Sequence, residues 1–289
     1  MLIKFTKNRQ WGVEMKIIAD CHLHTSFSGD STASMETQIL AGIQQGLQYM
    51  CFTDHYDPEF PYENNPDVAP GTFELDYPSY RREFLSMKEK YKDVIELRFG
   101  IELGLQAHLA PFLREYTSSH QDLDFIIGSN HLCAGFDPYY PDFLIGRTEE
   151  EALNLYLEES LVNIRAFDSI DSCGHLDYVA RYLPHRDQLY TYAAFADRID
   201  PILTELISKG IALEINTAPL MKGFRYFNPL PDILARYKEM GGELITIGSD
   251  AHMPEKIAGR FEETAEILQS LGFRYYAVYS DRKPQMLPL

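Results

Sequence analysis

The chain has 289 residues, of which 45% are hydrophobic and 24% are charged, a composition typical of globular proteins and unlike that of disordered, collagen-like or coiled-coil chains. Its 26 Lys and Arg against 43 Asp and Glu give a formal charge of −17, which argues against a nucleic-acid partner because such a partner requires a basic face. A small anionic substrate is not excluded, since bound metal ions reverse the local sign of the charge.

The N-terminal sequence and the cysteines predict a cytoplasmic location. The N-terminus lacks the apolar core and cleavage site of a signal peptide, and no apolar run approaches the ~18 residues that cross a bilayer. The four cysteines are widely spaced and form no C-x-x-C pair, so we expect free thiols in a cytoplasmic protein without a membrane partner. Because Met15 directly precedes a strand-like segment, residues 1–14 are interpreted as an N-terminal arm or an upstream extension, and residues 15–289 as one domain.

Short apolar runs alternate with helical patterns along the chain. The predicted strands are 16–21, 48–53, 95–103, 124–129, 169–174, 211–216, 243–249 and 274–279. The predicted helices are 34–46, 78–92, 106–120, 149–166, 191–209, 230–240 and 255–271. Seven or eight strand-then-helix units in one domain indicate an α/β barrel of parallel strands. An open doubly wound sheet is disfavoured because the first turn has no G-x-G-x-x-G.

Polar side chains typical of metal sites collect where the predicted strands end. They include six of the nine histidines, and in a β/α barrel the active site is built at that end from several strands. In chain order these residues are His22, His24, Asp30, Asp54, His55, Glu102, His131, His175, Asp177, Glu214, Asn216, Asp250 and His252.

The spacing of these residues predicts metal binding. Side chains two apart on a strand point to the same side, so His22 and His24 can bind one ion together, as can Asp250 and His252. Imidazole and carboxylate suit a divalent ion such as zinc, iron or manganese. A single H-x-H motif would be weak evidence for a metal site. H-x-H after the first predicted strand together with D-x-H after the seventh argues against the alternative that the six histidines are unrelated core or surface residues.

These motifs resemble the polymerase-and-histidinol-phosphatase (PHP) superfamily over residues 17–252. The resemblance rests on H-x-H at 22–24, TDH at 53–55, Glu102, His131, GHLD at 174–177 and GSDAH at 248–252. It implies a distorted seven-stranded (β/α)7 TIM-like barrel, in which the predicted strand 274–279 is peripheral. It also implies two or three divalent metal ions.

The resemblance assigns ligands to each implied ion. It places the first ion on His22, His24, Glu102 and Asp250, the second on Glu102, His131 and His175, and the third on Asp30, His55 and His252. Glu102 would therefore bridge the first two ions. Many relatives carry histidine at the position of Asp30, but aspartate is also a competent ligand.

Further sequence features, less specific than the metal ligands, resemble the histidinol-phosphate phosphatase branch of this superfamily. They are H-x-H-T-x-F-S-G-D-S after the first strand, GHLDYVARY at 174–182, GFRYFNPLP at 223–231 and the C-terminal RKPQMLPL. The branch implies hydrolysis of L-histidinol phosphate to L-histidinol and phosphate, in histidine biosynthesis, by attack of a hydroxide shared between two ions.

Further residues are expected to serve the phosphate and the leaving group. The predicted catalytic residues are Glu102, Arg181 and Asp54, and the predicted substrate-binding residues are Arg181, Arg225 and Asn216. The guanidinium groups match two phosphate oxygens at once. Asp54 is expected either to orient an imidazole or to donate a proton. The amine of the substrate would pair with a carboxylate at the rim, for which the candidates are Asp57, Glu63, Asp137 and Asp177. The imidazole of the substrate would stack on an aromatic ring, for which the candidates are Tyr56, Tyr182, Phe224 and Tyr226.

Three alternative functions remain open at this point. A related phosphoesterase acting on phosphotyrosine or a nucleotide would use the same metal set. An amidohydrolase barrel also begins with H-x-H, but that class commonly needs a carboxylated lysine in mid-barrel, and the sequence places Glu102 there. A non-enzymatic binding domain would be expected to have lost several ligands, whereas all nine predicted positions carry competent side chains.

Overall fold

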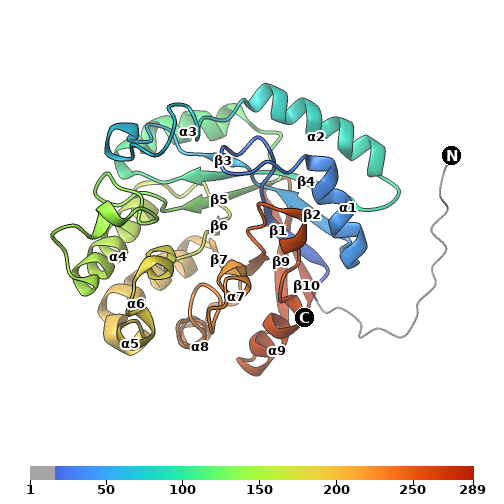
Figure 1. Cartoon of the computed structure of the whole chain (residues 1–289). Coiled ribbons are helices and arrows are strands. Elements are labelled where there is room, and N and C mark those ends of the chain that lie inside the picture. The colour runs from blue at the N-terminus through green and yellow to red at the C-terminus, as the bar shows by residue number, and fades with distance from the viewer. Residues whose placement is uncertain (1–16) are drawn as a thin grey trace.

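The structure, a computed structural model, describes residues 17–289, so the arm or extension predicted at residues 1–14 lies outside the described residues. Strands in the described part form an eight-stranded parallel sheet and a separate two-stranded hairpin (Figure 1). They are β1 (Ala19–Leu23), β2 (Tyr49–Phe52), β3 (His55–Tyr56), β4 (Glu96–Gly104), β5 (Phe125–Ser129), β6 (Ser172–Cys173), β7 (Ala212–Asn216), β8 (Ile245–Gly248), β9 (Tyr275–Ser280) and β10 (Lys283–Pro288).

The parallel sheet curls into a nearly closed barrel with seven strand positions. The strand order is β1-β2-β4-β5-β6-β7-β8, and β3 pairs with β4 in the same register as β2, so β2 and β3 occupy one position interrupted at Thr53 and Asp54. The sheet ends approach where Leu23 bridges Ala251, and the Asp250 N–H donates to the His22 carbonyl at 2.9 Å. The predicted seven-stranded parallel barrel is therefore confirmed.

Helices surround this barrel, as Figure 1 shows. Because helices cover the outside and side chains fill the inside, every residue of β1, β5, β7 and β8 is buried. The helices are α1 (Met35–Gln45), α2 (Tyr77–Tyr91), α3 (Ala110–Ser119), α4 (Glu149–Ala166), α5 (Arg186–Leu189), α6 (Tyr192–Lys209), α7 (Ala218–Met221), α8 (Pro231–Glu239) and α9 (Phe261–Ser270). Short 3-10 turns lie at Tyr62–Asn64, Ala107–Leu109, Pro141–Leu144, Tyr178–Tyr182 and Pro254–Lys256.

Two helices begin later than the sequence pattern predicts. Residues 107–109 form a 3-10 turn, so the helix predicted from 106 starts at Ala110. The helix predicted from 255 starts at Phe261, because Arg260 adopts a left-handed conformation (φ 64°) that an α-helix does not accommodate. Both displaced starts follow turns whose geometry hydrophobic periodicity does not encode.

The hairpin of β9 and β10 closes the amino-terminal end of the barrel. The Arg98 Nε of β4 donates to the Tyr279 carbonyl at 3.1 Å, and the Asp281 N–H donates to Asp124, just before β5. Strand β9 is therefore peripheral to the barrel, as expected. Strand β10 is not among the predicted strands, and its Pro284 and Pro288 are compatible with an exposed edge strand.

Two further expectations are checked by the fold. All four cysteines are buried and free. Within residues 17–289, none of the helices has the length and apolar character needed to cross a membrane.

Candidate metal centre

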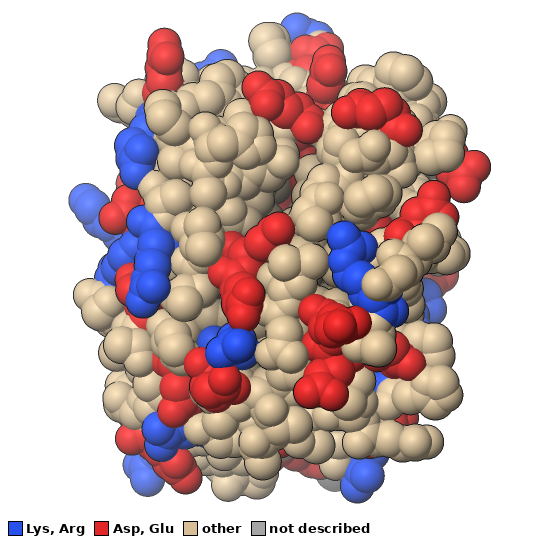
Figure 2. Space-filling model, turned by 90° about the vertical axis from the view of Figure 1, so that its left-hand side faces the viewer, with Lys and Arg blue, Asp and Glu red and all other residues tan. Residues whose placement is uncertain are grey.

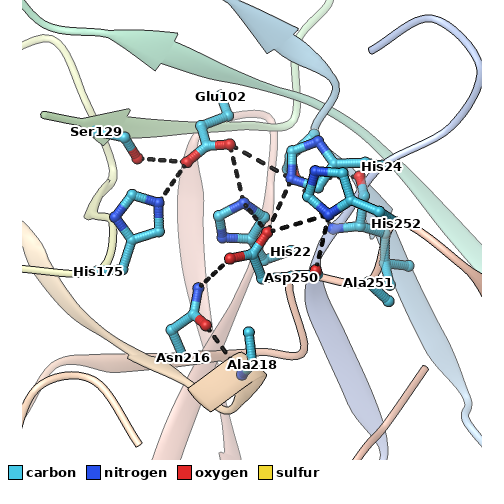
Figure 3. A network of polar contacts seen from close by, with 12 residues as sticks. His22, His24, Glu102, Ser129, His175, Asn216, Ala218, Asp250, Ala251 and His252 are labelled. Atoms are coloured by element: carbon cyan, nitrogen blue, oxygen red, sulfur yellow. Dashed lines mark hydrogen bonds and ion pairs between the residues drawn. The ribbon is translucent and has the colours of Figure 1, made fainter. Parts of the chain in front are cut away.

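All nine predicted metal ligands meet at the carboxyl ends of the barrel strands, and Figure 3 shows His22, His24, Glu102, His175, Asp250 and His252 among them. Glu102 of β4 lies at the centre of the group and is 0% exposed. One of its oxygens, Oε2, lies 3.0 Å from both His22 Nε2 and His55 Nδ1. The other, Oε1, lies 3.1 Å from His131 Nε2 and 2.9 Å from His175 Nε2. Glu102 thus faces two separate sets of imidazoles with its two oxygens.

Asp250 forms a second junction in the group. Its Oδ1 lies 3.3 Å from His24 Nε2 and 3.8 Å from His22 Nε2. Its Oδ2 accepts hydrogen bonds from Arg181 Nη1 at 3.1 Å and from Asn216 Nδ2 at 3.2 Å. One oxygen therefore faces His22 of β1 and His24 just after it, while the other is held by neighbouring side chains.

Asp30 joins the outer part of the group. Its Oδ2 lies 2.9 Å from His252 Nε2 and 3.5 Å from His55 Nε2. Its side chain is 42% exposed, far more than that of Glu102 or Asp250, so this set lies nearest to solvent. The predicted set of Asp30, His55 and His252 is brought together by the fold.

Several buried donor and acceptor atoms in this group make no hydrogen bond to any other described residue. An unpaired buried polar atom is costly, on the order of 1–3 kcal/mol, so a cluster of them indicates a missing partner. Four overlapping sets of three side chains have ligand atoms within 4.8 Å of one another: His24, His55 and His252; His22, Glu102 and His175; His22, His24 and Asp250; and His55, Asp57 and His131. The atoms without a hydrogen bond, several of which lie about 3 Å from one another, are His22 Nε2, His24 Nε2, His55 Nδ1, Glu102 Oε2, His175 Nδ1 and His252 Nε2. This nitrogen and oxygen donor set fits divalent metal ions.

Other side chains orient the imidazoles from behind. Glu214 contacts His22 Nδ1, and Asp57 Oδ1 lies 2.8 Å from His131 Nδ1. Ser28 Oγ lies 3.0 Å from His24 Nδ1. Each contact leaves Nε2 of the ring directed into the cluster, the arrangement found behind metal-bound histidines. This orienting role of Glu214 and Asp57 is not predicted from the sequence, although Glu214 lies on β7 and Asp57 directly follows β3.

The electrostatics of the group favour ionised carboxylates. Burial opposes the ionisation of Glu102, but His22, His131 and His55 together hold its pKa well below the ordinary value. Burial likewise opposes ionisation of Asp250, and His22, His24 and Arg181 outweigh it, so its pKa is also well below normal. Both side chains therefore present the negative charge that a cation requires.

The backbone at the site is strained in two places. Asp250 has φ 54° and His175 has φ 22°, values in the left-handed region that favours glycine. The Asp250 N–H donates to the His22 carbonyl, and the His175 N–H donates to Glu214 Oε2 at 2.8 Å, so hydrogen bonds fix both conformations. The glycine before Ser249 is needed for space, since a Cβ on Gly248 would lie 2.3 Å from the His22 Cβ.

The predicted substrate-binding residues are not all at the site. Arg181 is 8% exposed, and its Nε donates to Asn228 Oδ1 at 2.7 Å. Its Nη2 is buried and makes no hydrogen bond to any residue between 17 and 289. Arg225, in contrast, is exposed, lies over the Tyr226 ring and does not line the cavity, so the structure does not bring it to the centre.

Asn216 and Asp54 lie behind the site rather than in it. Asn216 is 0% exposed and donates to Glu214 and Asp250. Asp54 is also 0% exposed; it accepts hydrogen bonds from the Thr25 backbone and from Ser28 Oγ at 2.7 Å. Since Ser28 contacts His24, this favours the orienting alternative for Asp54 over the proton donor.

A cavity of about 410 Å³ opens beside the cluster. Figure 2 looks onto the face where the loops after the strands lie, and acidic and basic side chains are interspersed there rather than gathered into a basic patch. The cavity is lined by Asp30, His55, Asp57, Phe60, Phe73, His131, Asp137, Tyr139, Tyr140, His175, Tyr178, Arg181, Tyr182, Ala218, Met221, Lys222, Asp250, His252, Met253 and Lys256.

Comparisons with known proteins agree with this geometry. The model of the PHP domain family matches residues 20–218. The histidinol-phosphatase of Lactococcus lactis is 31% identical over 265 residues, which cover 91% of this chain and 95% of that protein. A relative from Clostridium acetobutylicum is 30% identical over 258 residues, covering 89% and 95%.

A solved structure extends the match to three dimensions. The crystal structure of histidinol phosphate phosphatase from Lactococcus lactis, complexed with zinc, L-histidinol and phosphate, matches with a TM-score of 0.82 and 31% identity, covering 92% of this chain and 98% of that chain. Family model, relatives and barrel fold lead to one conclusion: the chain belongs to the PHP domain family, in its histidinol-phosphatase branch.

Proposed function

We propose that this chain is a metal-dependent phosphomonoesterase that hydrolyses L-histidinol phosphate to L-histidinol and phosphate, a step of histidine biosynthesis. The observation that carries the proposal is the buried Arg181 Nη2, which has no hydrogen-bond acceptor among the described residues, on a side chain that lines the cavity and pairs with Asp250 through Nη1. A phosphate oxygen is the natural acceptor for such a guanidinium. The relative whose crystal structure holds zinc, L-histidinol and phosphate supports the identity of the substrate.

The proposal includes two to three divalent ions, zinc, iron or manganese, held by the nine side chains of the centre. His22, His24, Glu102 and Asp250 would hold the first, Glu102, His131 and His175 the second, and Asp30, His55 and His252 the third. The unpaired imidazole and carboxylate atoms support these sets. Bound ions would supply Lewis-acid stabilisation of the phosphoryl oxygens and would acidify water.

The remaining side chains act on orientation and charge. Asn228 and Asp250 hold two nitrogens of Arg181, which leaves the third nitrogen to donate to the phosphate in this proposal. Ser129 Oγ donates to Glu102 Oε1 at 2.6 Å and fixes the carboxylate between its two imidazole sets. Asp54 acts through Ser28 on His24, and Asn216 acts on Asp250; both are positioning residues in this proposal.

Steady-state rates on four phosphomonoesters test the proposed function. The metal-replete protein should show a higher kcat/KM on L-histidinol phosphate than on phosphotyrosine, a nucleoside monophosphate or p-nitrophenyl phosphate. The mixed surface charge in Figure 2 supports a small substrate rather than a nucleic-acid polymer. A higher kcat/KM on phosphotyrosine or the nucleotide would reject histidinol phosphate as the substrate while keeping the metallophosphoesterase.

A further inference from the structure

The cavity has a metal side and an aromatic side. Tyr178 lies at the boundary, with its ring centroid 5.2 Å from that of His175 and 5.7 Å from that of His131. Beyond it, the Tyr182 ring lies 5.0 Å from Tyr178 and the Tyr139 ring lies 5.4 Å from Tyr182. A phosphate held at Arg181 would therefore direct its leaving group toward this row of tyrosines.

Four carboxylates line the cavity, and three of them face histidines. Asp30 lies 2.9 Å from His252, Asp57 lies 2.8 Å from His131 and Asp250 lies 3.3 Å from His24. The fourth carboxylate, Asp137, makes no ion pair with any side chain of residues 17–289.

Two other acidic residues near the rim are not available to a ligand. Asp177 is 0% exposed, does not line the cavity, and accepts hydrogen bonds from Asn228 Nδ2 and the Leu230 N–H. Glu63 is exposed in the turn Tyr62–Asn64 and does not line the cavity either. Of the four rim carboxylates that the sequence suggested for the substrate amine, Asp137 alone lines the cavity without facing a histidine.

Asp137 is held rigidly by one of its oxygens. Its Oδ1 accepts from the Tyr139 N–H at 2.8 Å and from the Tyr178 hydroxyl at 3.2 Å. Its Oδ2 accepts no hydrogen bond from the described part of the chain, and the residue as a whole is only 7% exposed. Burial raises the pKa of Asp137 to about 6, so a cation beside it would relieve an unfavourable buried charge.

We propose that Asp137 determines the specificity for the leaving group: its Oδ2 pairs with a cation on the leaving alcohol, among the rings of Tyr178, Tyr182 and Tyr139. For L-histidinol phosphate that cation is the ammonium or the protonated imidazole, and this identification rests on the proposed function. The tyrosine faces add cation–π attraction for this cation. Asp137 recognises the part of the substrate that the metal centre does not contact.

The test uses the metal-loaded full chain with Asp137→Asn, which keeps the volume of the side chain and an acceptor for Tyr139. The kcat/KM on L-histidinol phosphate should fall about 10- to 1000-fold, as expected for the loss of a charge-assisted pair. The kcat/KM on p-nitrophenyl phosphate, whose leaving group carries no cation, should change less than about twofold, and the metal content should not change. Glu63→Gln, a carboxylate change outside the cavity, is the matched control and should leave both rates unchanged.

Two substrate analogues identify the paired cation. The 3-(imidazol-4-yl)propyl phosphate ester lacks the amine, and 2-aminopropyl phosphate lacks the imidazole. The analogue that no longer distinguishes wild type from Asp137→Asn has lost the cation that pairs with Asp137. Asp137→Glu, which keeps the charge, should retain part of the preference and serves if the Asn variant does not fold.

An equal fall on p-nitrophenyl phosphate, or no fall on L-histidinol phosphate, would overturn the role of Asp137. The outcome is separate from that of the proposed function. If wild type does not prefer L-histidinol phosphate, the proposed function fails, and the inference is then decided by whether Asp137→Asn still lowers the rates on cationic esters relative to neutral ones.

Discussion

The two ends of the barrel differ in how their buried charged side chains are paired. At the amino-terminal end, Arg282 pairs with Asp171 and also donates to the Ser169 carbonyl at 2.8 Å, while Asp124 accepts from the backbone N–H groups of Phe99 and Asp281. At the carboxyl-terminal end, histidine and carboxylate atoms are buried without hydrogen-bond partners among the described residues.

This difference separates stability from function. The hairpin end resembles an ordinary protein interior, in which buried polar groups are paired. The metal centre departs from that rule and also carries strained backbone at His175 and Asp250. Local rules are broken where chemistry is performed, and the rest of the fold compensates for the cost. Substitutions at the two ends should therefore separate activity from stability.

The largest effect is expected for Glu102→Gln. This change removes the charge that faces both imidazole sets, so the purified variant should lose at least two of its divalent ions. Its kcat/KM on L-histidinol phosphate should fall by about 10³-fold or more, since electrostatic stabilisation is commonly the largest catalytic contribution. Elemental analysis and steady-state kinetics measure both quantities.

Asp124→Asn, at the opposite end, is the matched control for Glu102→Gln. It also neutralises a buried carboxylate, one that lies just before β5, but it should leave metal content and kcat/KM unchanged. Fewer than one ion per wild-type chain after reconstitution would contradict the assigned ligand sets.

A smaller effect is expected for Arg181→Ala. Loss of a charge-assisted contact to phosphate should lower kcat/KM about 10- to 1000-fold while the bound metal stays in place. Arg181→Lys keeps the charge but not the forked geometry, and should recover only part of the rate. Wild-type kinetics in Arg181→Ala would remove this residue from the phosphate site.

The sequence predicts the metal centre better than the substrate side, and the reason is geometric. His22 lies on β1 and His24 directly follows its last residue, so the alternation of side chains along an extended chain turns both to one side. Arg225, in contrast, lies on the loop after α7, and a residue on a loop has no fixed direction, while Asn216 is the last residue of β7 and its hydrogen-bond partners are not fixed by strand alternation. In the structure, Arg225 is exposed and lies over the Tyr226 ring. The amide nitrogen of Asn216 donates hydrogen bonds to Glu214 and Asp250.

The fold shows the same division between regular and irregular parts. The barrel positions follow from alternating apolar runs and helical periods, and the parallel order was predicted from them. The interruption between β2 and β3, the late start of α9 and the strand β10 were not predicted. Each depends on a local turn or on an edge pairing, which a single sequence does not express as a hydrophobic period.

At the hairpin end, Arg282→Ala should reduce stability without touching activity. It leaves Asp171 buried without its ion pair, which costs about 1–3 kcal/mol of unfolding free energy. Urea denaturation of the metal-loaded protein measures the loss, and kcat/KM should equal that of wild type. Lys92→Ala breaks an exposed pair with Glu89 and, as the control, should cost less than about 0.5 kcal/mol. If Arg282→Ala lowered the free energy of unfolding no more than Lys92→Ala does, the ion pair of Arg282 with Asp171 would contribute little to stability.

The smallest effect concerns the pH dependence of stability at the same place. Burial raises the pKa of Asp171 from 3.8 to about 6, although Arg282 opposes the rise. The folded chain therefore binds the Asp171 proton more tightly than the unfolded chain, and this residue's contribution to the free energy of unfolding falls as pH rises from about 4 to about 6. Asp171→Asn carries no such proton, so the stability of wild type minus that of the variant should decrease across this window and become constant above it. Urea titrations of both proteins at about pH 4.5 and pH 7 measure the difference, in which the other carboxylates cancel. A difference that is equal at both pH values would mean that Asp171 is ionised with an ordinary pKa, and that Arg282 fully compensates its burial.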